Sequence, residues 1–268
     1  MQLLYQAFSL PGHYILLFIS HLGSTTILGW QSIYWILRGK IFTPQLWQSL
    51  NLVGVQSLPL ISFTALFSGM VLVVQVGNQF MELGAETYIG GVVGLSLTRE
   101  LSPLMVSIIL SARIGSSMAA ELGTMKVTEQ VDALQVMATN PVRFLVVPRI
   151  LACSFFTPVL VIYSNVVGIL GGLIVAVNQI GVNQTLFIDS LIRMVYPYDF
   201  FSGLFKSVAF GFIVALIGCY KGLTAEGGAK GVGGATTQSV VIIITSILVF
   251  NYFFSLAFFS YLKMIGRF

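Results

Sequence analysis

Long runs of apolar residues, interrupted by almost no charge, constrain the fold of this 268-residue chain more than any other feature. Several runs reach about 20 residues or more, the length that a helix needs to cross a hydrocarbon core of about 30 Å. Hydrophobic residues make up 56% of the chain and charged residues only 8%, whereas an ordinary soluble domain carries about 25% charged residues. We therefore expect an all-α integral membrane protein whose main solvent is lipid.

Five segments are predicted to span the membrane. They cover about residues 51–77, 88–111, 144–177, 200–220 and 239–262. A kink is expected near Pro59 in the first of them, a polar loop after the third, and a glycine-rich loop over residues 221–238. Small residues four positions apart predict close helix packing: Gly90 and Gly94, Gly115 and Ala119, Gly168 and Gly172, Gly211 and Ala215, Gly218 and Gly222. We treat residues 46–268 as one bundle within a single domain covering residues 1–268.

Residues 1–45 are expected to form a helix that lies in the membrane interface. The segment is apolar but has many polar interruptions, and its aromatic residues Trp30, Tyr34 and Trp35 are of the types found at headgroup level. A sixth span, from about Tyr14 to Leu37, is the alternative. We expect no removable secretory signal, because no basic residue precedes an apolar run at the start of the sequence.

Lysine and arginine residues near the ends of the spans predict the orientation. With five spans, one side carries Arg38, Lys40, Lys126, Arg143, Arg149, Lys221 and Lys230. The other side carries Glu82, Glu86, Asp189 and Asp199. Three basic residues depart from this pattern: Arg193, Lys263 and Arg267. We assign the more basic side to the cytoplasm.

Motifs for catalysis, metal binding or nucleic-acid binding are not found in the sequence. The formal charge of +4 is scattered, so we expect no nucleic-acid partner. Cys153 and Cys219 lie in apolar stretches and are expected to be buried as small hydrophobic residues. The glycine-rich segment lacks the ending of a phosphate-binding loop, and His13 and His21 lie far along the chain from serines such as Ser116. An enzyme is therefore not expected.

Polar residues inside two predicted spans are candidates for a binding site. Arg99 and Glu100 lie about ten residues from the outer end of the second span, where each costs a few kcal/mol unless it is paired or hydrated. Because neighbours on a helix point about 100° apart, we expect them to face different partners. The sequence leaves open whether they line a substrate cavity or form structural ion pairs.

A second polar feature lies on the first span. Ser68, Leu72, Gln75 and Gln79 follow at offsets of four, three and four, so they share one helical face. Two glutamines on that face indicate an inward, partly wet surface. The alternative is that they form hydrogen bonds between helices.

The polar stretch between the second and third spans is predicted to form a short amphipathic helix. Its polar face comprises Thr128, Asp132, Gln135 and Thr139. Its apolar face comprises Val131, Leu134 and Ala138. We expect Thr128 to cap its start and Asn140, before Pro141, to mark its end. Its acidic residues are not those that anionic lipid attracts, so a protein partner explains this helix better than the membrane surface.

The run from Thr98 to Ala152 resembles the signature region of the MlaE permease family. The resemblance is carried by RELSP, AELGTMKVTEQVDAL and NPVRFLVVPR. That family includes bacterial phospholipid-trafficking permeases and the permease of the chloroplast trigalactosyldiacylglycerol lipid importer. Ser102 stands where the family usually has glycine, and the neighbouring charged pair is kept.

The resemblance implies a five-span permease with an N-terminal interfacial helix, acting as a homodimer with two copies of a separate ABC ATPase. ATP and magnesium would bind to that ATPase, and no cofactor is expected in this chain. An MCE-domain protein would lie on the outer side, and lipid would be the substrate. The membrane would be a bacterial inner membrane, including that of cyanobacteria, or the plastid inner envelope.

The resemblance also assigns residues. The ATPase would dock on a coupling helix of about residues 124–140, through Glu129, Gln130, Asp132, Ala133 and Leu134. The lipid cavity at the dimer interface would include Leu72, Gln75, Gln79, Phe80, Arg99 and Glu100. Two other functions remain as alternatives: a secondary transporter that uses Arg99 and Glu100 for ion coupling, and an intramembrane enzyme. The intramembrane enzyme is the weaker alternative, because no nucleophile and base are paired.

Overall fold

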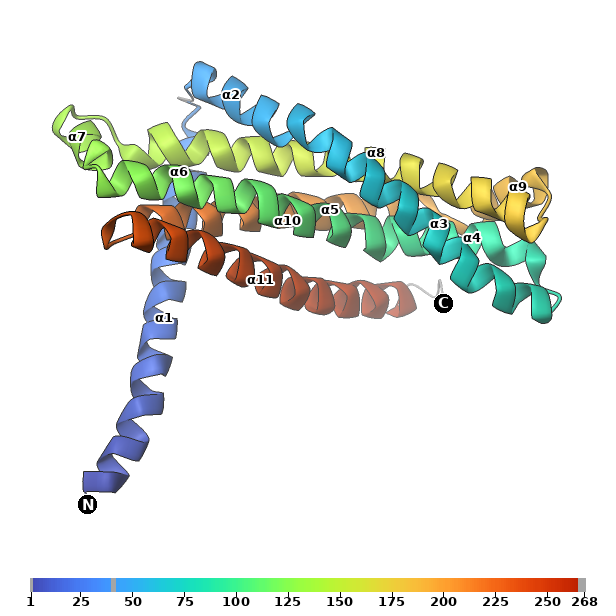
Figure 1. Cartoon of the computed structure of the whole chain (residues 1–268), viewed down its shortest axis with the longest axis horizontal. Helices are drawn as coiled ribbons and strands as arrows, with labels where there is room; N and C mark the ends of the chain where they lie inside the picture. Colours follow the sequence, from blue (N-terminus) through green and yellow to red (C-terminus); the bar gives the residue numbers. More distant parts are fainter. Residues whose placement is uncertain (1, 40–41, 265–268) are drawn as a thin grey trace.

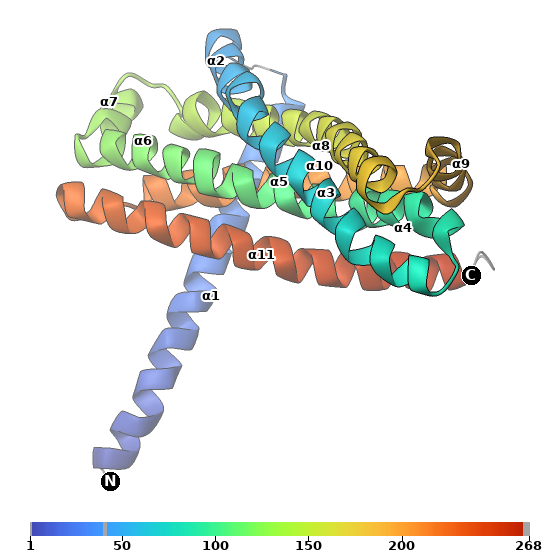
Figure 2. The same ribbon diagram turned by 45° about the vertical axis from the view of Figure 1, so that its right-hand side comes forward.

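The computed structural model describes residues 2–39 and 42–264, so Lys40 and Arg267, which entered the orientation argument, lie outside the described residues. Throughout these ranges the elements are helices. Long helices run side by side in one bundle, while α1 (Gln2–Leu37) runs steeply across the long axis of that bundle (Figures 1 and 2).

Five helical segments are long and apolar enough to cross a membrane, which confirms the predicted number of spans. They are Thr43–Glu82, Glu86–Val127, Val142–Ile180, Pro197–Leu223 and Gly228–Met264. Within the described residues, α1 is not among them. Several of these segments are longer than the sequence predicted, because the helices continue beyond the apolar runs into the polar regions at both ends.

The first two spans are interrupted helices. The first contains α2 (Thr43–Val53), the 3-10 turn η1 (Val55–Ser57) and α3 (Leu58–Glu82). The second contains η2 (Glu86–Tyr88), α4 (Ile89–Ser96), the π-helical turn η3 (Leu97–Leu101), α5 (Ser102–Leu110), the π-helical turn η4 (Ser111–Gly115) and α6 (Ser116–Val127). The break in the first span lies at Gly54, before Pro59. Pro59 is in the first turn of α3, where its missing N–H group is tolerated.

The remaining chain contains the last three spans and two short helices, α7 and α9. α7 (Gln130–Val136) follows α6, and the third span contains the π-helical turn η5 (Val142–Val146), α8 (Val147–Val175) and the π-helical turn η6 (Ala176–Ile180). α9 (Gln184–Met194), α10 (Pro197–Leu223) and α11 (Gly228–Met264) follow.

Two loop predictions were wrong. The segment after the third span contains α9, which starts at Asn183, whose side chain accepts a hydrogen bond from the Thr185 N–H group. The glycine-rich segment is mostly helix, and only residues 224–227 link α10 to α11. There the packing of α11 against α6 and α10 outweighs the low helix propensity of glycine.

The two ends of the bundle are marked by two short helices. α7 lies at one end and α9 at the other (Figure 1). α1 packs near the α7 end: the Nδ1 atom of His21 lies 2.8 Å from the hydroxyl of Tyr220, near the end of α10. Leu28 and Ser32 of α1 are buried, whereas Trp30 is 74% exposed.

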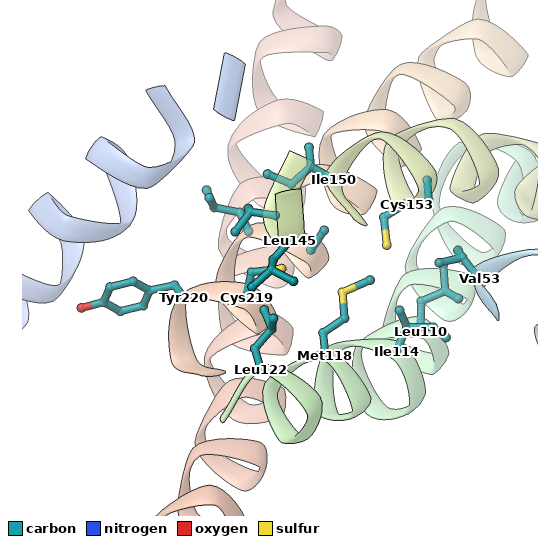
Figure 3. Close-up of a cluster of buried hydrophobic side chains, with 14 of the residues drawn as sticks. Val53, Leu110, Ile114, Met118, Leu122, Leu145, Ile150, Cys153, Cys219 and Tyr220 are labelled. Carbon is teal, nitrogen blue, oxygen red and sulfur yellow. The ribbon is translucent and has the colours of Figure 1, made fainter. Parts of the chain in front are cut away.

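The largest buried cluster joins α6, α8 and α10 near the α7 end (Figure 3). Both cysteines lie in it, free and buried, which confirms the prediction of their burial. Glycines let the helices approach closely around this cluster. A Cβ atom on Gly218 would lie 3.0 Å from the carbonyl oxygen of Gly115, and one on Gly222 would lie 3.0 Å from that of Ala119. The predicted small-residue packing is therefore present.

Candidate functional site

A cluster of four charged side chains lies inside the membrane-spanning bundle, between η3, α10 and α11. Arg99 of η3 donates from Nε to Oδ1 of Asp199 at 2.6 Å, and its guanidinium lies 5.6 Å from the centre of the Phe259 ring. Asp199 is fully buried and also accepts a hydrogen bond from the Tyr196 N–H group at 3.1 Å. Arg99 thereby ties the second span to the start of α10.

Glu100 faces a second group of partners. Its Oε1 atom accepts hydrogen bonds from Nζ of Lys206 at 2.7 Å and from the hydroxyl of Ser255 at 2.8 Å. Its Oε2 atom accepts from the side-chain amide of Asn251 at 2.9 Å. The two neighbouring charged residues therefore have different partners, as the helical geometry predicted.

The local backbone explains why the charges meet here. A π-helical turn holds one more residue than an α-helical turn and often marks functional sites. The carbonyl oxygen of Arg99, in η3, accepts a further hydrogen bond from Nζ of Lys206 at 3.2 Å. α10 comes close at Gly203, where any Cβ atom would overlap the carbonyl group of Thr98.

Lys206 was not identified from the sequence, and Asp199 was predicted only as an outer-side charge. A signal was available, since the two lie seven residues apart on one apolar span, where a lysine is rare and usually paired. Asn251 and Ser255 lie four residues apart on α11, so they share a face. Which residue would pair with which could not be read from the sequence, because the pairs are 100 and 106 residues apart.

The residues predicted to line a lipid cavity do not surround one hollow in a single chain. Gln75 and Gln79 are exposed. Leu72 and Phe80 are partly buried against a second hydrophobic cluster, which contains Val73 and Phe187. Arg99 and Glu100 instead face α10 and α11. One hollow of about 920 Å³ lies elsewhere, between α8, α10 and α11, and is lined mainly by aromatic residues such as Phe205.

At the end of the bundle where α6 stops, α7 is shorter than the predicted helix and starts differently. The hydroxyl of Thr128 donates to the carbonyl of Thr124 at 2.8 Å, so Thr128 ends α6 and does not cap α7. Glu129 precedes α7 with a left-handed backbone, φ 61°. This turn reverses the chain between the two helices.

The side chains of this segment divide into inward and outward groups. Val131 is buried and Leu134 packs against the main core, while Nζ of Lys126 lies 2.9 Å from Oδ1 of Asp132. Over residues 129–137, the exposed residues are Glu129, Gln130, Ala133, Gln135, Val136 and Met137. Three of the five predicted docking residues are thus exposed, Asp132 is half exposed and held in an ion pair, and Leu134 is turned inward.

Val136 and Met137 form an apolar tip that the sequence analysis missed. They are 89% and 74% exposed. The amphipathic pattern over residues 128–139 did not predict this tip, because α7 ends at Val136 and the chain turns there, with Ala138 also left-handed at φ 56°. Within the described residues, no group of three side chains is arranged to hold a metal ion.

Comparison with known proteins gives consistent matches over most of the chain. A family model described as "Permease MlaE" matches residues 46–257. A "Probable ABC transporter permease protein" of Synechocystis is 43% identical over 243 residues, which cover 91% of this chain and 92% of the relative. A protein of the same description from Rickettsia prowazekii is 39% identical, covering 94% of this chain and 97% of the relative. "Protein TRIGALACTOSYLDIACYLGLYCEROL 1, chloroplastic" of Arabidopsis thaliana is 38% identical, covering 88% of this chain and 68% of the relative.

Proposed function

Because the chain belongs to the MlaE permease family and is an ABC transporter permease, we propose that it forms the membrane-spanning part of a transporter that moves phospholipid or a related lipid between membranes. A separate ATPase would bind ATP and magnesium and drive the movement. A second copy of this chain and an outer MCE-domain protein would complete the assembly. The name of the Arabidopsis relative contains that of a glycolipid, which supports a lipid substrate.

The organisms in which the relatives occur also bear on the membrane in which this chain is located. The relatives come from a cyanobacterium, from Rickettsia and from chloroplast-containing organisms. We therefore propose a bacterial inner membrane or the plastid inner envelope.

The observation that carries the ATPase partnership is the shape of the cytoplasmic end. α7 projects there as a short helix whose exposed side presents acidic and amide groups, Glu129 and Gln130, beside the apolar tip of Val136 and Met137. Protein interfaces typically combine such an apolar centre with a polar rim. Residues of the ATPase would cover the apolar tip and pair with Glu129.

A co-purification experiment tests this surface. Glu129→Lys and Val136→Asp should each reduce the amount of ATPase that co-purifies with the chain. Asp189→Lys is the matched control, because Asp189 is also exposed but lies on α9 at the opposite end. Normal ATPase binding by both α7 variants would contradict the proposed docking surface.

The role of Asp132 needs a separate experiment, because reversing its charge alone would also break its ion pair with Lys126. The double variant Lys126→Asp, Asp132→Lys restores the pair with the charges exchanged. If the ATPase recognises the carboxylate of Asp132, the exchange should abolish binding. Retained binding would assign Asp132 a role only in holding α7 against α6.

For the lipid, we propose that two copies together enclose a cavity that one chain does not form. Gln75 and Gln79 present polar groups on an exposed face of α3. Arg99 uses only Nε in its contact with Asp199, so its terminal nitrogens could donate to an anionic lipid headgroup. Glu100, by contrast, already has three donors, which disfavours the alternative in which it carries a transported ion.

Photo-crosslinking tests this cavity. A crosslinker at Leu72 or Gln79 should capture lipid above the background given by a crosslinker at Val249, a residue that is 52% exposed on α11. Equal capture at the three positions would contradict the assignment. Transport by the purified chain alone, driven by an ion gradient, would instead support a secondary transporter.

We also propose that α1 lies in the cytoplasmic membrane interface. It crosses the bundle near the end of α10, where Tyr220 contacts His21, and it exposes Trp30 on its outer side. Tryptophan is the residue type favoured at headgroup depth.

A further inference from the structure

Arg113 makes an unusual set of contacts in the second half of the second span, 14 residues before the span ends at Val127. Its guanidinium donates to the main-chain carbonyl of Gln56, to the hydroxyl oxygen of Ser57 at 3.1 Å and to Oε1 of Gln56 at 3.3 Å. All three acceptors are uncharged and belong to the first span. An arginine fork, with five donors in one plane, suits such a set of acceptors.

These acceptors mark the place where the first span is broken. Gln56 and Ser57 form η1, between α2 and α3. Gly54 has a non-helical backbone, φ −78° and ψ −82°, and a Cβ atom there would overlap the ring of Phe156. Pro59 has no N–H group to continue the hydrogen bonding of a helix across the junction. Arg113 therefore binds a natural hinge in the backbone.

Arg113 itself belongs to a continuous connection to α7. It lies in the π-helical turn η4, which leads directly into α6. α7 is held to the end of α6 by the ion pair between Lys126 and Asp132. A displacement of α7 would be carried along α6 to η4, a π-helical turn of the kind that often occurs at functional sites.

The other side of the contact leads toward the proposed lipid cavity. α3 continues from the hinge as one helix to Glu82 and carries Leu72, Gln75 and Gln79. α3 packs mainly on α8, whereas α6 packs on α10 and α11. Arg113 thus joins two parts of the bundle that pack on different helices.

From this geometry, and resting on the proposed function, we propose that Arg113 is a positioning residue that transmits movement of α7 to α3. When the ATPase displaces α7, Arg113 carries the hinge at Gln56 and Ser57 with it and re-orients the glutamine face of α3. A residue that only stabilised the fold would not alter the amount of lipid moved for each ATP hydrolysed.

The test compares that ratio among variants of the complete complex in vesicles, with a fluorescent nitrobenzoxadiazole phospholipid as the probe. Arg113→Met should lower the lipid transferred per ATP by about tenfold, within the range of typical coupling free energies, while ATPase co-purification is retained. Arg113→Lys should be intermediate, because an ammonium cannot reach all three acceptors together. Thr245→Ala is the control, since the Thr245 hydroxyl donates to the carbonyl of Val241 within its own helix, α11.

A second variant guards against misfolding of Arg113→Met. The pair Gln56→Ala, Ser57→Ala keeps the arginine but removes two of its three acceptors, and it should lower the same ratio several-fold. A wild-type ratio in this pair or in Arg113→Met would overturn the proposal, as would loss of ATPase co-purification in both, which would mean a structural role alone. A wild-type complex that moves no phospholipid would instead refute the proposed function.

Discussion

Replacing Lys206 by methionine should destabilise the protein, because it removes the cation that neutralises Glu100 inside the bundle. Nζ of Lys206 lies 2.7 Å from Oε1 of Glu100, and the lysine side chain is 2% exposed. Breaking a buried ion pair by removing one partner costs about 3–5 kcal/mol. The Glu100 side chain is 34% exposed and keeps two donors from α11, so we expect the lower end, about 3 kcal/mol.

The double variant Glu100→Gln, Lys206→Met separates the charge from the hydrogen bonds. A glutamine at position 100 has no charge to neutralise, and its carbonyl oxygen can still accept from Asn251 or Ser255. We expect this double variant to lose only about 1 kcal/mol, close to the value of one hydrogen bond. The coupling free energy between the two positions should then be about 2 kcal/mol or more, as for contacting residues in one network.

Thermal unfolding in detergent, followed by circular dichroism, measures these differences. For a chain of this size, 1 kcal/mol corresponds to about 2–4 °C in Tm, so Lys206→Met should unfold about 6–12 °C below the wild type. Lys230→Met is the matched control, because Lys230 is exposed near the start of α11, and its Tm should hardly change. Additive effects of the two single variants would refute the reasoning, because independent side chains do not couple.

Three further predictions test other parts of the structure. Gly218→Val should destabilise the bundle by about 1–3 kcal/mol through overpacking, because its Cβ atom would lie 3.0 Å from the Gly115 carbonyl oxygen. Gly233→Ala should not destabilise it, because a Cβ atom there has nothing within 4 Å. Equal Tm values for the two variants would contradict the packing account. Cys153 and Cys219 should resist a maleimide in the folded protein and react after denaturation in detergent, and rapid labelling of the native protein would contradict their burial. In a variant with Trp30 as the only tryptophan, lipid brominated close to the headgroup should quench its fluorescence more than lipid brominated at the chain end, and the opposite order would place α1 deeper than the interface.

The spans were predictable because their signal is local. Twenty apolar residues in a row demand a helix wherever lipid is the solvent, so the number and order of the spans followed from hydropathy. Helix ends were less predictable, because packing sets them. The glycine-rich segment became part of α11 where Ala235 is buried in the bundle, and Thr128 ended one helix and did not start the next.

The site was predictable only in part, since its partners come from distant spans. The Arg99–Glu100 pair could be identified as polar residues in an apolar span, and their divergence follows from the helical angle. Their partners on α10 and α11 depend on how the helices pack, and a local sequence pattern does not predict that packing. Arg113 was missed for the same reason: its acceptors lie 56 and 57 residues earlier in the chain.

The balance of charge in the intramembrane cluster bears on how the protein uses energy. Two cations, Arg99 and Lys206, face two carboxylates, Asp199 and Glu100, so the cluster is neutral as a whole. A carboxylate that carries a transported ion must be able to exchange its partners, but each carboxylate here is held by a cation and by additional hydrogen-bond donors. Such a cluster fastens η3 to α10 and α11. We propose that the energy for movement enters elsewhere, through the exposed surface of α7, which α6 connects to the hinge bound by Arg113.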